Sequence, residues 1–265
     1  MTAGSTQVQD WILIRGLIRA RFHWGDFPQQ LLNQLPAGTR LHTPEVAGNG
    51  ERFAEKTPFS IHAMMHDVRQ QCLQSGSLDH GPVVIVAISM GAMIAAEWAR
   101  CFPGEIRALH LINTSFSNLS SPISRMRAGA FFGLWGAYLT GQSLESAILR
   151  WTSNQPQTRL AGHWEAYAES HPLSLRNALA QLLSASSFRG PEAAPCPAWC
   201  YTSLGDRLVN PECTARIAHL WQVPLATHPS AGHDLPLDDS AWLIHEILNN
   251  AKIENNEGLS AANKA

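Results

Sequence analysis

The sequence predicts an α/β protein whose sheet is mostly parallel, has about six strands and carries helices on both faces. Short apolar segments alternate with longer helical segments over most of the 265 residues, as in sheets built from strand–helix–strand units. One segment, 83–88, is apolar throughout and mostly β-branched, which indicates a strand covered on both faces. Another stretch, 116–188, shows helical patterns and no strand, which indicates a helical insertion over one end of the sheet.

Each expected strand is a short apolar run bounded by turn residues. In chain order, the strands are expected at 11–14, 39–46, 83–88, 106–112, 198–203 and 225–228. Arg15-Gly16 gives the first strand a sharp end, and Gly48-Asn49-Gly50 closes the second.

Helices are expected between these strands, because apolar residues recur there at helical spacing. The pattern predicts core helices at 27–35, 60–72, 91–100 and 239–249, and insertion helices at 127–139, 143–151 and 173–183. Asn210-Pro211-Glu212 starts one more core helix, since it combines a cap residue, a proline at the first helical position and an acid.

These elements divide the chain into a core and a cap. We expect the core to comprise 10–115 and 189–250, and the helical cap to comprise 116–188. The polar segments 1–9 and 251–265 are expected to be flexible termini.

Composition restricts the partners. The formal net charge is -2 and charged residues make up 15% of the chain, so we expect no nucleic acid and no membrane surface as main partner. The cysteine count, five, is odd, and the N-terminus has no signal-peptide pattern, which favours free thiols in the cytoplasm. His62 and His66 stand at zinc-compatible spacing without companion ligands, so neither a metal nor a cofactor is expected.

Ala87-Ile88-Ser89-Met90-Gly91 follows the buried strand directly and opens a helix. It nearly matches G-x-S-x-G, in which a serine sits on a strained turn that lifts its hydroxyl clear of the sheet. The flanking residues must be small because strand and helix approach closely there, and alanine at position 87 departs least from glycine. Ser89 is the predicted nucleophile, and a plain helix N-cap is the alternative.

A serine nucleophile needs a base, and in this arrangement the chain order is serine, acid, histidine. Gly205-Asp206 follows one late strand and Gly232-His233 follows the last, so both fall on loops at the carboxyl edge of the sheet. Alone, Asp206 would be interpreted as a turn residue and His233 as one loop histidine among 12. Their joint spacing predicts an acid and a general base. The rival acids Asp234, Asp238 and Asp239 are expected to solvate the loop or to start the last helix.

The reaction also needs donors for an oxyanion. The backbone N–H groups of Met90, after the nucleophile, and of Leu17, after the first strand, are the candidates. Nearby, Arg19 and Trp24 are candidate substrate-binding residues, and the cap adds Trp135. The favoured alternative is that the arginines of this loop, Arg19 and Arg21, solvate the loop or pair with Asp26 and Glu45.

With these motifs the chain resembles the α/β-hydrolase superfamily, in particular its small capped esterases, of which the carboxylesterase of biotin synthesis is one. The resemblance spans roughly 11–248 and implies an α/β-hydrolase fold, a serine esterase triad of Ser89, Asp206 and His233, and no cofactor. Many members have His-Gly where this chain has Arg15-Gly16. That difference puts in doubt the polar surroundings of the oxyanion hole.

The predicted function is hydrolysis of a carboxylic ester or thioester of small or medium acyl chain through an acyl-enzyme, by a monomer or small homo-oligomer. Two alternatives stay open. One is C–C bond hydrolysis or lyase chemistry on the same triad, for which Arg15, Arg19 and Arg21 are the only indication. The other is a non-catalytic ligand-binding protein on a hydrolase scaffold.

Overall fold

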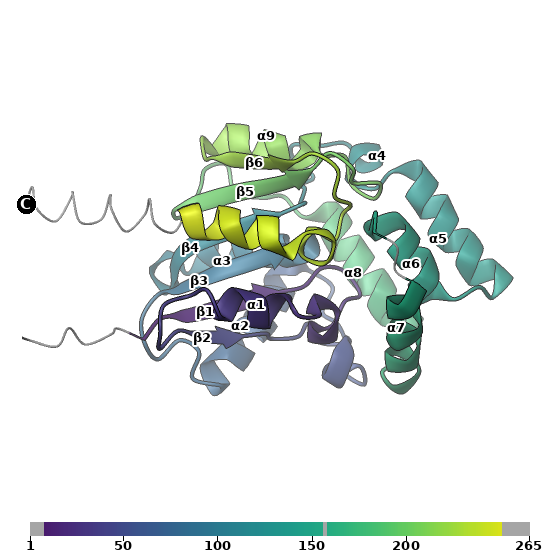
Figure 1. The fold of residues 1–265 in the computed structure, drawn as a ribbon, viewed down its shortest axis with the longest axis horizontal. Coiled ribbons are helices and arrows are strands. Elements are labelled where there is room, and N and C mark those ends of the chain that lie inside the picture. Colours follow the sequence, from purple (N-terminus) through teal and green to yellow (C-terminus); the bar gives the residue numbers. More distant parts are fainter. Residues whose placement is uncertain (1–7, 156–157, 251–265) are drawn as a thin grey trace, which may run out of the picture.

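The computed structural model describes residues 8–155 and 158–250. It contains one six-stranded, all-parallel sheet with the strand order β2-β1-β3-β4-β5-β6, which confirms the predicted class (Figure 1). The strands are β1 (Asp10–Ile14), β2 (Arg40–His42), β3 (Val83–Ile88), β4 (Ile106–Ile112), β5 (Ala198–Ser203) and β6 (Leu225–His228). The edge strand β2 is shorter than the predicted 39–46, because Pro44 has no N–H to donate to a sheet ladder.

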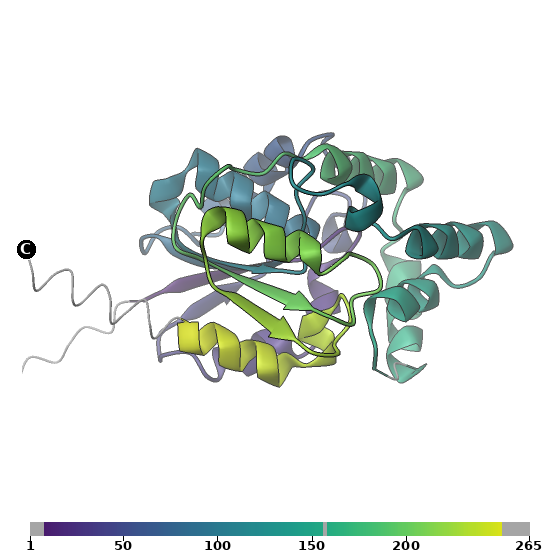
Figure 2. The ribbon, with the colours of Figure 1, turned by 90° about the horizontal axis from the view of Figure 1, so that it is seen from above.

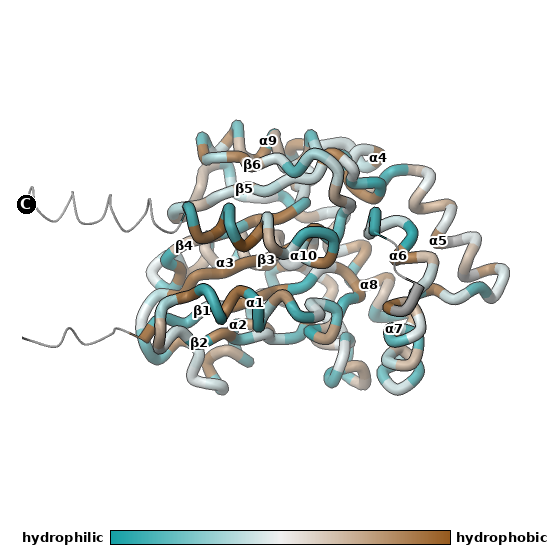
Figure 3. The backbone as a smooth tube through the Cα atoms, in the orientation of Figure 1, coloured by the Kyte–Doolittle hydropathy of each residue, from teal (hydrophilic) through white to brown (hydrophobic). Residues whose placement is uncertain are grey.

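Helices cover both faces of this sheet (Figure 2). Those of the core are α1 (Phe27–Leu32), α2 (Ile61–Gln74), α3 (Met90–Cys101), α9 (Glu212–Trp221), the short α10 (Leu235–Asp238) and a last helical segment, 240–250. Single 3-10 turns stand at Arg21–Trp24 (η1), Gly50–Arg52 (η2) and Pro103–Glu105 (η3). Figure 3 shows hydrophobic residues concentrated along the central strands and the helix faces that adjoin them.

The strand alternation creates two cores, one on each face of the sheet. On β1, Ile12 and Ile14 pack with residues of α2, α3 and α9, whereas Trp11 and Leu13 pack with residues of α1 and the last helical segment. All four side chains are buried, as expected of a strand that is covered on both faces.

The stretch predicted as a cap is helical, and it lies beyond the carboxyl ends of the strands (Figure 1). Its helices are α4 (Pro122–Arg125), α5 (Ala128–Thr140), α6 (Leu144–Thr152), α7 (Thr158–Ser170) and α8 (Leu175–Ser187). Three of them match predicted segments, and α7 was not predicted. The expected flexibility of the termini concerns mainly 1–7 and 251–265, which lie outside the described residues.

Within 8–155 and 158–250, no helix combines the length and the apolar character needed to cross a bilayer.

His110 is a buried histidine of β4 that should make the fold sensitive to acid. Its ring stacks between Trp11 and Trp199, at centroid distances of 6.0 and 5.3 Å, and its Nδ1 is 2.7 Å from the hydroxyl of Tyr201. Burial lowers the pKa of His110 from 6.5 to about 3. As pH falls below 6.5, His110 therefore becomes protonated in the unfolded chain, whereas in the folded chain it stays neutral down to about pH 3. The free energy of unfolding decreases over this range.

We expect His110→Phe to remove this sensitivity, because phenylalanine keeps the stacking and cannot titrate. The native histidine should cost about 1.4 kcal/mol of unfolding free energy per pH unit below its unfolded pKa. Urea unfolding at pH 7 and pH 5 measures the difference, with His245→Gln at an exposed position as control. Equal acid-induced losses in the wild type and His110→Phe would contradict the prediction.

Candidate active site

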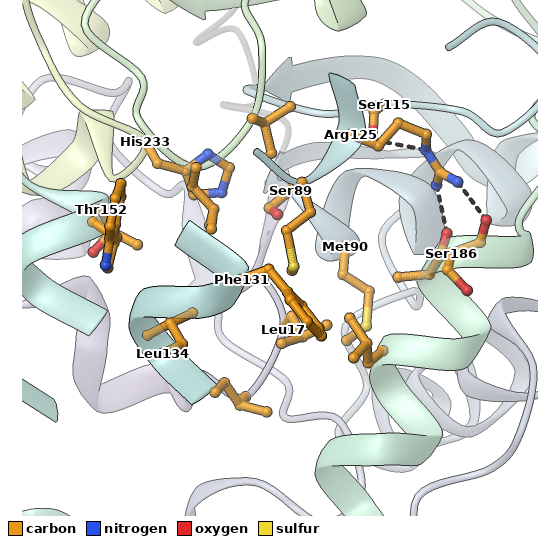
Figure 4. A pocket seen from close by; sticks show the side chains of 18 of the residues that line it. Leu17, Ser89, Met90, Ser115, Arg125, Phe131, Leu134, Thr152, Ser186 and His233 are labelled. Carbon is orange, nitrogen blue, oxygen red and sulfur yellow. Dashed lines mark hydrogen bonds between the residues drawn. The ribbon is translucent and has the colours of Figure 1, made fainter. Parts of the chain in front are cut away.

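Ser89 occupies a sharp turn between β3 and α3. Its φ of 57° and ψ of -121° lie where residues other than glycine are uncommon. The turn is held from β4 and the residues after it: the Ser89 N–H donates to Ile112 O at 2.9 Å, and the Thr114 hydroxyl donates to Ser89 O at 2.8 Å. The strand–turn–helix context expected around Ser89 is therefore present, and its side chain borders a cavity (Figure 4).

Gly91 explains why this turn needs small neighbours. A Cβ at this position would lie 2.5 Å from the backbone oxygen of Arg15 and even closer to that of Ile14, well inside van der Waals contact. The helix therefore packs directly against the end of β1. Ala87, in the other flanking position, is fully buried, and the turn accommodates its methyl group.

Gly91→Ala should destabilise the protein, because neither backbone carbonyl can move away without displacing β1. We expect a loss of about 2–3 kcal/mol in unfolding free energy, typical of overpacking. Gly136→Ala on α5 is the matched control: a Cβ there meets nothing within 4 Å, and alanine favours the helix. Chemical denaturation of the two variants checks this, and equal stability would contradict it.

Asp206 and His233 meet on neighbouring loops at the carboxyl edge of the sheet. The Nδ1 atom of His233 lies 2.7 Å from Oδ2 of Asp206, and both residues are buried. The other carboxylate oxygen of Asp206 accepts the N–H groups of Leu208 at 2.8 Å and Val209 at 2.9 Å. The acid is thus fixed by its own loop, and it leaves Nε2 of the imidazole free for another partner.

His233 and Ser89 border the same cavity (Figure 4). Among the described residues no hydrogen bond joins their side chains. In hydrolases without substrate this contact is often long and tightens when substrate binds.

Asn113, just after β4, holds the histidine loop, a role that the sequence pattern did not reveal. Its buried side chain donates to His233 O at 2.8 Å and accepts the N–H of Ser203 at 2.9 Å. The loop after β6 is thereby tied to the end of β5. Its position could have indicated this role, because Asn113 is a polar residue directly after a buried strand, at the carboxyl edge of the sheet.

Arg15 and Asp234 form a buried ion pair beside the catalytic candidates. Two parallel hydrogen bonds of 2.9 and 2.5 Å join them, and each side chain is 5% exposed. The expectation that Asp234 solvates the loop or starts the last helix is corrected in part: it stands directly before α10, but its carboxylate compensates a buried guanidinium. Arg15 is therefore occupied and not free to receive a substrate carboxylate.

The oxyanion-hole candidates flank Ser89. Gly16 lies so close that a Cβ there would be 3.0 Å from Cβ of Ser89, which brings the loop after β1 against Ser89. Leu17 and Met90 both line the cavity. Met90 is the first residue of α3, where the helix offers its N–H no partner, and among the described residues none accepts the N–H of Leu17.

The three candidate substrate-binding residues differ in position. Arg19 lines the cavity, but it pairs with Glu145 of the cap at 2.9 Å. Trp24 is buried below Arg15, whose guanidinium lies 4.8 Å from its ring, and it is not among the cavity-lining residues, a correction to its expected role. Trp135 belongs to α5, and its side chain lies outside what the structure describes.

The cavity has a volume of about 550 Å³ and lies between the core loops and the cap. Most of the side chains around it are apolar, among them Leu17, Met90, Met93, Phe131, Leu134 and Trp151. Such a site matches the size and character of small-molecule pockets.

One group of potential metal ligands occurs in the described part of the chain, away from this cavity. His62, Glu97 and Cys101 bring ligand atoms within 4.8 Å of one another. Glu97 already accepts two hydrogen bonds from Arg100, at 2.8 and 2.6 Å. His66, which stands at zinc-compatible spacing from His62, is not a member of this group.

Solved structures similar to this chain include an esterase, a thioesterase and a lipase-esterase related protein. An esterase from Thermogutta terrifontis aligns with a TM-score of 0.70 at 18% identity, covering 93% of this chain and 90% of the other. The RedJ thioesterase from Streptomyces coelicolor gives 0.68 at 14% identity, with 91% and 90% covered. A lipase-esterase related protein from Clostridium acetobutylicum gives 0.69 at 13% identity, with 91% and 93% covered. At these identities the likeness shows the fold alone.

No curated protein matches the sequence. A protein-family model does, the alpha/beta hydrolase family, over residues 12–246. The match includes both strand-end loops of the candidate triad and the whole predicted cap. The chain is therefore a member of the alpha/beta hydrolase family.

Proposed function

We propose that the protein is a serine hydrolase that cleaves a carboxylic ester or thioester, with Ser89 as nucleophile, His233 as general base and Asp206 as the residue that orients it. One observation carries the proposal: the Asp206–His233 hydrogen bond stands at the same cavity as a serine on a strained strand-to-helix turn. Triads are recognised by such geometry and roles.

The chemistry follows from these positions. The hydroxyl of Ser89 attacks the substrate carbonyl carbon while its proton passes to Nε2 of His233. The resulting oxyanion accepts hydrogen bonds from the N–H groups of Leu17 and Met90. His233 then protonates the leaving alcohol or thiol, and the acyl-enzyme remains. Water, deprotonated by His233, releases the acid by the same steps, while Asp206 stays ionised and holds the imidazole.

The cavity supports an apolar acyl group of small or medium length as the substrate. The domain division, with core 10–115 and 189–250 and cap 116–188, would leave selection of that group to α5, α6 and α8, which contribute Phe131, Trp151 and Leu183 to the cavity wall. The small capped esterases, such as the carboxylesterase of biotin synthesis, serve as the model for this arrangement. The esterase and thioesterases among the similar structures favour the same reaction class.

Hydrolysis of p-nitrophenyl esters from acetate to decanoate tests the proposal. We expect turnover that rises with chain length to an intermediate optimum, because the cavity is apolar but limited in volume. A fluorophosphonate probe should label the protein at Ser89 in parallel. A protein that neither turns over esters nor labels would contradict the proposal and favour the C–C bond or ligand-binding alternative.

The C–C bond alternative has little support in the cavity. It needs cations that hold a diketone or dicarboxylate, but Arg15 pairs with Asp234, Arg19 pairs with Glu145, and the side chain of Arg21 is 53% exposed.

A further inference from the structure

Ile18 has an unusual backbone conformation next to a proposed oxyanion donor. Its φ is 53°, a region that a β-branched residue adopts only when its surroundings enforce it. It directly follows Leu17, whose N–H is one of the two proposed donors. A hydrogen bond to the Ile18 N–H fixes the Leu17–Ile18 peptide, which adjoins the Gly16–Leu17 peptide that carries the Leu17 N–H.

The backbone of Ile18 is held by a hydrogen bond whose acceptor lies in the cap. The Ile18 N–H donates to Oε1 of Gln181 at 2.7 Å, and Gln181 belongs to α8, 163 residues further along the chain. Gln181 has no exposed surface. A buried amide is costly unless its groups are paired, so its position is strongly determined by its partners.

Those partners lie between β2 and α2, one directly before η2 and one after it. Nε2 of Gln181 donates to Oδ1 of Asn49 at 2.8 Å and lies 3.4 Å from the hydroxyl of Thr57. Asn49 in turn donates to the backbone oxygen of Arg19 at 3.2 Å. Both residues that follow Leu17 are thus fixed by one buried polar network, which links the cap to the core.

We propose that Gln181 is a positioning residue for catalysis: by holding the strained backbone of Ile18, it orients the N–H of Leu17 toward the reacting carbonyl. The cap then takes part in transition-state stabilisation as well as in substrate selection. This inference rests on the proposed hydrolase function. A purely structural link between cap and core would affect stability without a specific effect on the oxyanion.

Gln181→Leu is the main test, with ester hydrolysis and an alkylboronic acid as readouts. The boronic acid forms a tetrahedral adduct with the serine and so reports on the oxyanion hole. We expect kcat to fall about 10- to 100-fold with KM within about threefold of wild type, since a displaced donor costs less than a deleted one. The inhibition constant of the boronic acid should rise in parallel, and that of the carboxylate product should not change.

Two further variants make the test specific. Gln181→Glu keeps an acceptor for the Ile18 N–H but turns a second oxygen toward Oδ1 of Asn49, so its kcat should lie between those of Gln181→Leu and the wild type. Ser184→Ala, on the same helix, removes a buried hydroxyl that has no hydrogen-bond partner within 8–155 and 158–250, and it should behave like the wild type. If Gln181→Leu does not fold, Asn49→Ala replaces it, because it loosens Gln181 without altering it; kcat should then fall about three- to tenfold.

The proposal is overturned if Gln181→Leu, or Asn49→Ala in its place, keeps the wild-type kcat, or if the boronic acid and the carboxylate product lose affinity equally. Failure of the hydrolase function itself is seen separately, since the wild type would then neither hydrolyse esters nor bind the boronic acid more tightly than Ser89→Ala does.

Discussion

Ser89→Ala is expected to lower kcat for p-nitrophenyl ester hydrolysis by about 10⁴- to 10⁶-fold, while KM changes little. Alanine cannot form the acyl-enzyme, so the two-step reaction is lost and only direct attack by water remains. The cavity and the oxyanion donors persist, which is why a residual rate above the uncatalysed reaction should survive. Steady-state kinetics, with the fluorophosphonate probe as a check for loss of labelling, measure the effect.

Ser115→Ala is the control for that result. Ser115 lines the same cavity, but its hydroxyl accepts a hydrogen bond from Nε of Arg125 at 3.2 Å (Figure 4), and in the described part of the chain no hydrogen bond joins it to a histidine. Its replacement should leave kcat within a factor of about three. Similar losses in both variants, or more than a hundredth of the activity left in Ser89→Ala, would remove Ser89 from the nucleophile position.

Asp206→Asn should lower kcat by about 10⁴-fold, the loss typical of a triad whose acid becomes an amide. The asparagine oxygen can still accept the N–H groups of Leu208 and Val209, so the loop should keep its shape. The amide nitrogen would then face Nδ1 of His233 and donate to it. The imidazole would then carry its proton on Nε2. A protonated Nε2 cannot accept the proton of Ser89.

Two measurements separate this tautomer effect from misfolding. Thermal unfolding of Asp206→Asn should stay close to that of the wild type, because the substitution keeps its volume and its backbone contacts. Asp239→Asn is the matched control: Asp239 lies near His233 in sequence, and it caps Trp242 at 3.0 Å. Activity in Asp206→Asn within tenfold of wild type would contradict its assignment.

The strands were the most predictable part of the fold. β3, β4, β5 and β6 have the predicted bounds. For β3, β4 and β5 the reason is that strands buried on two faces show apolar runs between turn residues, whereas β6 is a partly exposed edge strand of four residues. The edge strand β2 and the helix α7 were predicted poorly or not at all. α7 mixes polar and apolar residues, and only its tertiary contacts reveal that Trp164 is buried.

The candidate triad was predictable because each member follows a strand, and all parallel strands end at one edge. The residues that support it were not. Asn113, Gln181 and Asp234 act on partners 120, 163 and 219 residues away in the chain. Such contacts follow neither the helical nor the strand period, so no local pattern of hydrophobicity marks them.

The ion pair between Arg15 and Asp234 also bears on how the protein becomes active after synthesis. Asp234 is synthesised 219 residues after Arg15, so the guanidinium has no counter-charge until the segment after β6 has been made. The loop after β1 then cannot settle beside Ser89 in an incomplete chain at low cost. In a nascent fragment that already contains β1 and Ser89, the loop after β1 should therefore stay unsettled beside Ser89 until the segment that carries Asp234 docks.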